Sequence, residues 1–183
     1  MSSKELYQKL YEDKRLAYGQ AEKNRCPGVR YLPLFKGWII PSVMDFGCGT
    51  GDTVKALTAE GIDAVGIDQI ELNNGMLVGD ITQPQPIGAD IDGRYNTAIS
   101  IDVFEHIEDE PLLGLIDNMK KFKRQVITVH AKTAYERGYT ENLHVNIKSI
   151  HEWTLFLAKH FRLCGRLYLS SCRALFFCGE RPA

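Results

Sequence analysis

A glycine-rich turn follows the first strongly apolar stretch near the middle of the N-terminal half. In the segment DFGCGTGD, Gly47, Gly49 and Gly51 alternate with other residues between Asp45 and Asp52. Glycine loses more conformational freedom on folding than any other residue, so three in close succession indicate a backbone that a ligand must approach closely. The turn leads into a helix, whose first backbone N–H groups favour negative charge.

Acidic residues follow the next apolar stretches, at the points where strands would end. Asp68 ends the segment VGID, and Asp80 precedes Ile81 in VGDI. The Asp68 carboxylate can accept hydrogen bonds from both hydroxyls of a ribose. Asp80 can accept one from the exocyclic amine of adenine, while the Ile81 N–H donates to a ring nitrogen. The pattern therefore predicts a nucleoside site that begins at the glycine turn.

Two classes of nucleoside ligand fit this pattern, a dinucleotide and S-adenosylmethionine. The dinucleotide fingerprint G-x-G-x-x-G places a third glycine where this chain has Asp52, and a carboxylate there would oppose a pyrophosphate. A later apolar stretch ends in SIDVFEH, which adds Asp102 and Glu105 to the acidic set. Acids at a strand end suit the cationic sulfonium and α-amino groups of S-adenosylmethionine, so the residues favour this ligand over NAD.

In order and spacing, four segments resemble the cofactor motifs of class I S-adenosylmethionine-dependent methyltransferases. They are DFGCGTGD (45–52), VGID (65–68), GDI (79–81) and SIDVFEHIED (100–109). The resemblance implies an S-adenosylmethionine-dependent methyltransferase that releases S-adenosylhomocysteine. It also implies a single domain over 1–183, with a cofactor-binding core at 43–183 and an N-terminal helical lid or acceptor segment at 1–42.

The resemblance also assigns the cofactor-binding residues. The glycine loop would contact the methionine part, the acid of VGID the ribose, the GDI segment the adenine, and the backbone of 101–103 the methionine end. The predicted set is Asp45, Gly47, Cys48, Gly49, Asp68, Gln69, Asp80, Ile81, Ile101, Asp102 and Val103. Other interpretations stay open for some of them: Asp45 orients the loop, Asp102 caps the following helix, or Cys48 presents only its backbone.

Histidines are the candidates for handling the acceptor's proton. Oxygen acceptors of high pKa need a base or a metal, and the pKa of histidine lies near neutrality. His106 follows the fourth predicted strand, His130 ends the fifth, and His144, the first choice among them, lies in the loop before the last helix. Each is a candidate base, with a hydrogen-bonded structural role as the alternative. No metal-ligand cluster stands out, so no metal is predicted, although Asp102, Glu105 and His106 leave an opening for one.

The predicted acceptor is a small hydroxylated molecule, methylated on oxygen by an in-line displacement. The segment HVNIK at 144–148 resembles a stretch in bacterial methyltransferases that act on sugars or other small hydroxylated metabolites. The segments 1–42 and 131–147 hold aromatic and polar residues outside the core, and we expect them to close over the cofactor as a lid. These residues are Tyr7, Tyr11, Tyr18, Tyr31 and Trp38 in the first segment and Tyr135, Tyr139, Asn142 and His144 in the second. The segment SIDVF replaces the Asn/Asp-Pro-Pro-aromatic motif of enzymes that methylate DNA bases, which argues against that activity.

The elements that must position these residues alternate between strands and helices. Strands are predicted at 42–47, 62–68, 75–81, 93–102 and 124–131, helices at 3–18, 50–61, 103–122 and 149–161, and a hairpin at 162–180. Such alternation predicts an α/β fold, a three-layer αβα Rossmann-like sandwich around a mostly parallel seven-stranded sheet that ends in an antiparallel hairpin. Ligands bind at the carboxyl ends of such strands, where all the motifs lie. The prolines of 26–41 predict a turn-rich connector there.

The amino-acid composition argues against nucleic acid and membranes as partners. The chain has 183 residues, 44% hydrophobic and 25% charged, with a net charge of −1. This balance offers no strong field for nucleic acid or a membrane, and no apolar run approaches the ~20 residues that span a bilayer. The five cysteines form no C-x-x-C pair, which favours reduced thiols in the cytoplasm.

Three other functions remain as alternatives at this point. The first is a partner or regulatory protein that binds S-adenosylmethionine without turnover. The second is a nucleic-acid methyltransferase acting on ribose or cap hydroxyls, against which the near-neutral charge argues. The third is a nucleotide-dependent oxidoreductase, which Asp52 disfavours. The sequence does not identify the acceptor or the oligomeric state.

Overall fold

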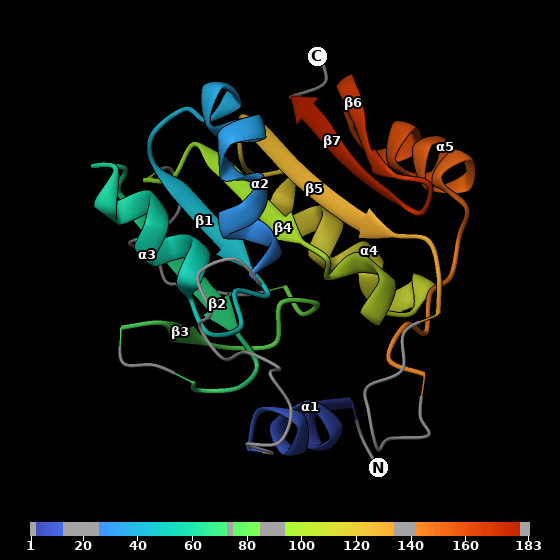
Figure 1. The fold of residues 1–183 in the computed structure, drawn as a ribbon, viewed down its shortest axis with the longest axis horizontal. Coiled ribbons are helices and arrows are strands. Elements are labelled where there is room, and N and C mark those ends of the chain that lie inside the picture. Colours follow the sequence, from blue (N-terminus) through green and yellow to red (C-terminus); the bar gives the residue numbers. More distant parts are fainter. Residues whose placement is uncertain (1–2, 13–25, 73–74, 85–93, 134–141, 180–183) are drawn as a thin grey trace.

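A seven-stranded sheet forms the centre of the molecule (Figure 1). The computed structural model describes residues 3–12, 26–72, 75–84, 94–133 and 142–179. The strands are β1 (Val43–Phe46), β2 (Ala64–Asp68), β3 (Leu77–Val78), β4 (Thr97–Ile101), β5 (Arg124–His130), β6 (Arg162–Ser170) and β7 (Arg173–Gly179). Their order across the sheet is β3-β2-β1-β4-β5-β7-β6.

The first five strands are parallel and the last two close the sheet as an antiparallel pair. β1 lies between β2 and β4, and β4 pairs with β5. β7 then runs antiparallel to β5, which brings Arg173 opposite His130. The predicted fold class, an αβα Rossmann-like sandwich with a terminal hairpin, is confirmed.

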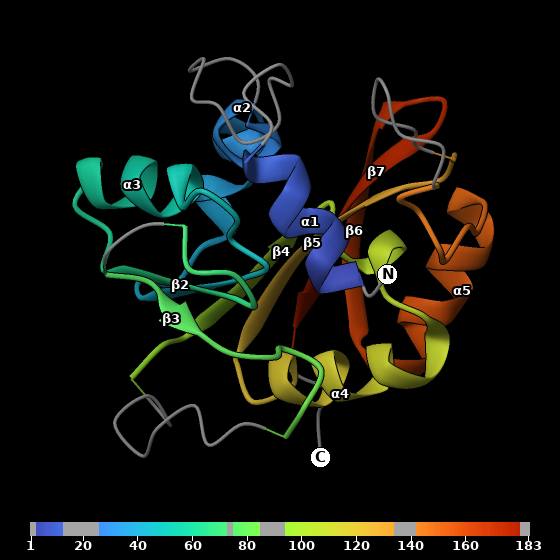
Figure 2. The same ribbon diagram turned by 90° about the horizontal axis from the view of Figure 1, so that it is seen from below.

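Helices cover both faces of the sheet (Figure 2). The helices are α1 (Ser3–Glu12), α2 (Pro27–Phe35), α3 (Asp52–Ala59), α4 (Asp109–Met119) and α5 (Ile150–His160), with short 3-10 turns η1 (Lys36–Trp38) and η2 (Phe104–His106). Leu115 of α4 and Trp153 of α5 pack with Phe46 and Ile127 on one face. Residues of α2 and α3, such as Leu57, pack with apolar side chains of the other face.

Local sequence explains where several elements begin. Ser149 starts α5 with a reciprocal capping box: its side chain accepts from the Glu152 N–H, and the Glu152 carboxylate accepts from the Ser149 N–H. The predicted turn-rich connector at 26–41 is wrong, because α2 and η1 occupy most of it. Pro27 stands in the first turn of α2, where a missing N–H has no helical partner to lose.

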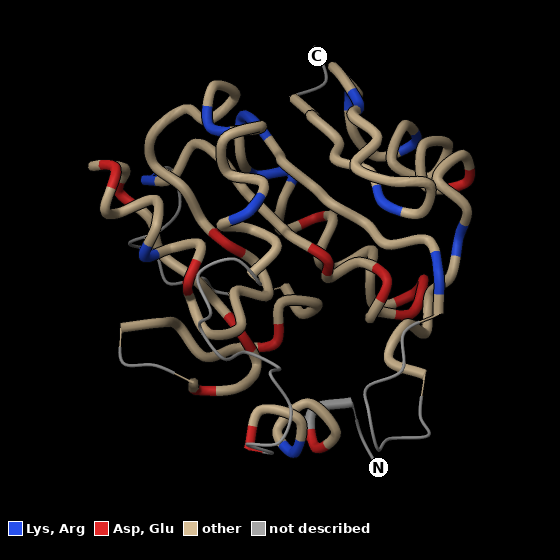
Figure 3. The backbone as a smooth tube through the Cα atoms, in the orientation of Figure 1, with Lys and Arg blue, Asp and Glu red and all other residues tan. Residues whose placement is uncertain are grey.

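The carboxyl ends of β1, β2, β3 and β4 open toward α1, which lies apart from the main body of the sheet (Figure 1). Acidic residues gather on this side of the molecule (Figure 3). The predicted helix at 103–122 is divided into η2 and α4, so residues 107–108 form a bend beside the same opening. Among the described helices, none combines the length and apolar character needed to cross a bilayer.

Candidate active site

The glycine turn connects β1 to α3 with backbone that ordinary residues rarely adopt. Gly47, Gly49 and Gly51 have φ values of 78°, 51° and 70°. A Cβ at Gly47 would lie 2.6 Å from a methyl group of Val103, and one at Gly49 would lie 2.8 Å from the Tyr11 hydroxyl. Both the left-handed backbone and the lack of space therefore require glycine here.

Asp68 ties the end of β2 to this turn. Its Oδ2 accepts from the Gly49 N–H at 2.9 Å, and its Oδ1 accepts from the Ile70 N–H at 3.2 Å. Burial raises the pKa of Asp68, although the hydrogen bonds from Gly49 and Ile70 oppose that shift. The carboxylate thus holds the turn in place and still lines the cavity that the turn borders.

Asp45 lies below the turn, in the buried part of β1. Its side chain is 3% exposed, and burial together with the Asp68 carboxylate raises its pKa to about 8. The Cys48 thiol, in the turn itself, contacts Met76 Sδ at 3.7 Å. Burial and the same two carboxylates raise the pKa of Cys48, so this thiol stays neutral.

The raised pKa of Asp45 predicts how stability varies with pH. The folded-state value of about 8 exceeds the ordinary 3.8, so the folded protein holds a proton that the unfolded chain releases between these values. The contribution of Asp45 to the free energy of unfolding should therefore be most favourable below pH 4 and should decline as the pH rises toward 8. Asp45→Asn, which cannot ionise, should be more stable than wild type at pH 8 by up to roughly 5 kcal/mol and equally stable at pH 4. Denaturant unfolding at both pH values, with surface variant Asp63→Asn as control, measures this; equal pH slopes for wild type and Asp45→Asn contradict it.

Hydrogen bonds hold the segment 80–83, which follows β3, in place from two sides. Asp80 Oδ1 accepts from the Thr82 N–H at 2.9 Å and from the Thr82 hydroxyl at 2.7 Å. Asn118 of α4 donates through its amide nitrogen to the carbonyls of Ile81, at 2.9 Å, and Gln83, at 2.8 Å. These contacts position the loop that the sequence predicts to bind adenine.

One cavity of about 630 Å³ joins these segments. The predicted cofactor-binding residues that line it are Gly47, Asp68, Gln69, Asp80, Ile81, Asp102 and Val103. The others, Asp45, Cys48, Gly49 and Ile101, are not part of its lining. The wall opposite is formed by Leu6, Tyr7 and Tyr11 of α1 and by Val145. The two tyrosines belong to the predicted lid, whereas the lining residues that the sequence analysis missed are Leu6, Thr82, Ile107, Glu108, Pro111 and Val145.

The two segments of the predicted lid meet beside this cavity. Leu6 and Leu10 of α1 pack against Leu143 from the loop that precedes α5. Tyr31, from the same predicted lid, lies in the core between α2 and the sheet and not at the cavity. The predicted lid residues Tyr18, Tyr135 and Tyr139 fall outside the described part of the chain.

Asp102 has an unusual backbone and a strong ion pair. Among the described residues it is the non-glycine residue with a positive φ, 54°, a conformation that costs of order 1–3 kcal/mol. Its Oδ1 accepts from the Thr128 hydroxyl at 2.7 Å, and its Oδ2 lies 3.1 Å from Arg173 Nη2. η2 begins after Val103, so Asp102 does not cap it. No pattern in the sequence pointed to Arg173, which comes from β7.

The three candidate histidines lie in one group but face different partners. The ring of His144 is 4.7 Å from that of His106 and 5.0 Å from that of His130, centroid to centroid. His130 Nε2 lies 3.2 Å from Cys172 Sγ, and neither His130 nor His144 is part of the cavity lining. His106 lines the cavity and contacts the Tyr7 hydroxyl. Of the three candidate histidines, His106 is therefore the one that lines the cavity.

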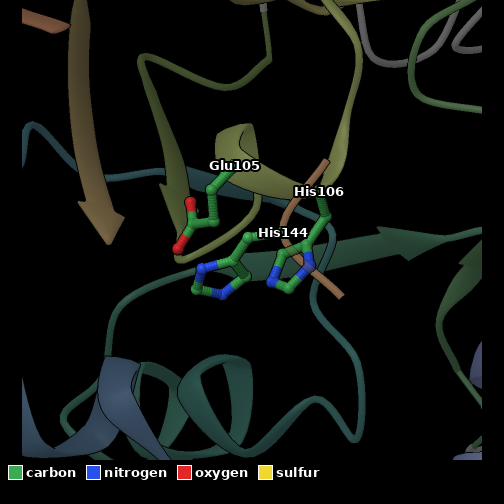
Figure 4. Close-up of side chains that lie close together, drawn as sticks. All are labelled: Glu105, His106 and His144. Carbon is green, nitrogen blue, oxygen red and sulfur yellow. The ribbon is translucent and has the colours of Figure 1, made fainter. Parts of the chain in front are cut away.

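Burial keeps these imidazoles neutral. Burial, with a contribution from His144, lowers the pKa of His106 to about 4. Burial likewise lowers the pKa values of His130 and His144. Glu105, adjacent in sequence to His106, is fully buried, and burial together with the charge of Asp102 raises its pKa. Figure 4 shows Glu105, His106 and His144 side by side.

Comparisons with known proteins were consistent with this geometry. Residues 5–170 match the family described as "Methyltransferase domain". The PH0226 protein from Pyrococcus horikoshii OT3 has a similar structure, with a TM-score of 0.71 and 15% identity over 89% of this chain and 93% of that chain. No protein with a curated description matches the sequence.

Two further solved structures share the fold. The 1,6-didemethyltoxoflavin-N1-methyltransferase of Burkholderia thailandensis, with its substrate and S-adenosylhomocysteine bound, has a TM-score of 0.68 and 14% identity over 96% of this chain and 86% of that chain. An S-adenosylmethionine-dependent methyltransferase from Clostridium acetobutylicum ATCC 824 has a TM-score of 0.65 and 10% identity over 96% and 99% of the two chains.

Proposed function

Since the chain belongs to the methyltransferase domain family of class I S-adenosylmethionine-dependent enzymes, we propose that it methylates a hydroxyl group of a small molecule. The observation that supports this most is the cavity, which joins the acidic strand ends to one neutral imidazole, His106, and to two tyrosines. An enzyme needs such a space for an acceptor, whereas a protein that only binds the cofactor does not. The free cysteines are consistent with the predicted cytoplasmic location.

The residues of the cavity fit the cofactor. Asp68 lines the cavity and would accept from the ribose hydroxyls, and the backbone of the turn around Gly47 would contact the methionine part. Asp80 and Ile81, which also line the cavity, would bind the adenine. The positive charges of the sulfonium and α-amino groups would stabilise the ionised form of the buried carboxyl groups beside the turn.

The rest of the cavity lining suits a hydroxylated acceptor. Tyr7, Tyr11 and His106 bring polar groups and aromatic surface to the cavity. Burial lowers the pKa of His106 to about 4, so its imidazole is neutral at physiological pH and free to take a proton, although it is a weaker base than an ordinary histidine.

Methyl transfer from S-adenosylmethionine requires the protein mainly to position the acceptor oxygen. S-adenosylmethionine supplies a methyl group already activated by its sulfonium. As the acceptor oxygen forms its bond to the methyl carbon, the carbon–sulfur bond breaks and its electron pair stays on sulfur. Without a bound metal ion, the hydroxyl proton passes to the imidazole of His106, which lines the cavity. Orienting the oxygen in line with the breaking bond is the main contribution of the cavity walls.

Methyl transfer from labelled S-adenosylmethionine to a panel of hydroxylated metabolites, with amines and RNA oligonucleotides included, tests the proposal. We expect a hydroxylated small molecule to accept the label. His106→Gln should then lower the turnover rate by about 100-fold or more, the usual contribution of a general base, with unchanged affinity for S-adenosylhomocysteine. His151→Gln, on the exposed surface of α5, is the control. Labelling of amines or RNA alone contradicts the proposal, and so does a full-rate His106→Gln enzyme.

A further inference from the structure

Three potential ligand side chains converge beneath the His106 end of the cavity. Glu105 and His106 come from η2, and His144 comes from the loop before α5. Each offers one carboxylate or imidazole ligand atom, and these atoms lie within 4.8 Å of one another. In Figure 4 the Glu105 carboxylate points to the ring of His144, and the His106 ring faces that ring from the other side.

The hydrogen bonds of both imidazoles fix which nitrogen is basic. His106 Nδ1 lies 2.8 Å from the Leu143 carbonyl, and His144 Nδ1 contacts the Lys132 carbonyl. Because a carbonyl oxygen only accepts, His144 Nδ1 carries the hydrogen and its Nε2 keeps a lone pair. His106 Nδ1 also contacts the Tyr7 hydroxyl, and a hydrogen on this nitrogen satisfies both partners because a hydroxyl oxygen can accept too. A ring N–H donated to a backbone carbonyl is the usual support of a metal-binding histidine.

Glu105 brings a buried carboxyl group with one oxygen that lacks a partner. Its Oε1 accepts from the His130 N–H at 3.0 Å. Its Oε2 is buried and has no hydrogen-bond partner among the described residues. The guanidinium of Arg173 pairs instead with Asp102 at 3.1 Å and with the Tyr31 hydroxyl at 3.1 Å. A buried carboxylate oxygen of this kind needs a cation or a proton donor.

We propose that Glu105, His106 and His144 bind one divalent transition-metal ion. Two imidazole nitrogens and one carboxylate oxygen suit Zn²⁺ or Co²⁺ better than Ca²⁺ or Mg²⁺, which take oxygen ligands. Ligand atoms around such an ion stand roughly 3–4 Å apart, so loading requires the three groups to draw together by about 1 Å. Three protein ligands leave coordination positions open, and His106 borders the cavity.

The role of this ion rests on the proposed function, whereas the site itself rests on the contacts above. An ion at the open end would orient a hydroxyl of the acceptor and lower its pKa. The hydroxyl proton would then leave to water, and His106 would serve as a ligand and not as the proton acceptor. The rest of the transfer is unchanged: the oxygen–carbon bond forms, and sulfur keeps the electron pair of the broken bond.

Titration of the chelator-treated full-length protein with Co²⁺, followed by calorimetry and visible absorption, tests the site. We expect one equivalent to bind with an absorption typical of nitrogen and oxygen ligands, and Zn²⁺ to displace it. Glu105→Gln and His144→Ala should each weaken binding by at least about 100-fold, since each removes a direct ligand. His151→Ala, on the exposed face of α5, should bind as wild type does.

Several results would overturn the proposal. They are the absence of binding, an absorption typical of thiolate ligands, and affinity retained in both Glu105→Gln and His144→Ala. Where a variant does not fold, as judged by circular dichroism, the other variant decides. Methyl transfer measured with and without chelator separates the two proposals: full activity in chelator removes the ion's role and leaves the proposed function standing. Ion binding without transfer to any hydroxylated acceptor leaves the site standing and removes that function.

Discussion

Gly49→Val should weaken S-adenosylmethionine binding by at least about 100-fold, or roughly 3 kcal/mol, while the protein remains folded. Valine at a φ of 51° is strained, and its Cβ would lie 2.8 Å from the Tyr11 hydroxyl. The Tyr11 side chain can move away, but the strained backbone shifts the turn itself, which disturbs the hydrogen bond from the Gly49 N–H to Asp68 at 2.9 Å. Cofactor binding is lost because the turn and the Asp68 carboxylate, which is expected to bind the ribose, move together.

Gly61→Val is the matched control for this experiment. Gly61 also has a positive φ, 79°, but no atom lies within 4 Å of the position that a Cβ would occupy there. Both variants should lose a similar amount of stability, about 1–2 kcal/mol, from the left-handed backbone. Calorimetric affinities that fall equally in the two variants, or in neither, would show that the turn does not contact the cofactor.

Asp68→Ala has the second largest expected effect. A hydrogen bond to a charged group contributes about 1.5–3 kcal/mol, so the loss of this carboxylate should weaken cofactor binding by roughly 10- to 150-fold. The structure adds a second reason, because Asp68 also accepts from the Gly49 and Ile70 N–H groups. Asp68→Asn keeps the shape of the side chain but places an amide donor beside these N–H groups or the ribose.

Calorimetry on Asp68→Ala and Asp68→Asn measures this effect. We expect both variants to bind S-adenosylmethionine more weakly than wild type. Asp117→Ala, which removes an exposed carboxylate paired with Lys120, should leave the affinity unchanged. Wild-type affinity in Asp68→Ala would place the ribose elsewhere along the strand ends.

Much of the fold was predictable because local patterns and tertiary structure agree. Apolar segments that end in glycine or aspartate indicated the strands, and the glycines at 47, 49 and 51 do adopt the left-handed backbone that their type suggests. The error at α2 arose because proline is read as a helix breaker, whereas Pro27 lies in the first turn, where a helix tolerates it, and α2 also continues through Pro33. Sequence alone does not reveal which of these positional effects applies.

The acceptor side of the site was less predictable because it depends on distant contacts. Arg173 reaches Asp102 through the pairing of β5 with β7, in which His130 lies opposite Arg173. The contact of His106 with His144 joins η2 to a loop almost forty positions later. No local pattern encodes these pairings, so all three histidines stayed candidates until the structure distinguished their surroundings.

Calorimetric titration of the purified protein with S-adenosylmethionine, with NAD as the control, tests the central claim most directly. We expect S-adenosylmethionine to bind at one site per chain and NAD to show no binding. This result would support the assignment of the glycine turn, Asp68 and the Asp80 loop to the cofactor. Binding of NAD, or of neither ligand, would contradict that assignment and the proposed function built on it.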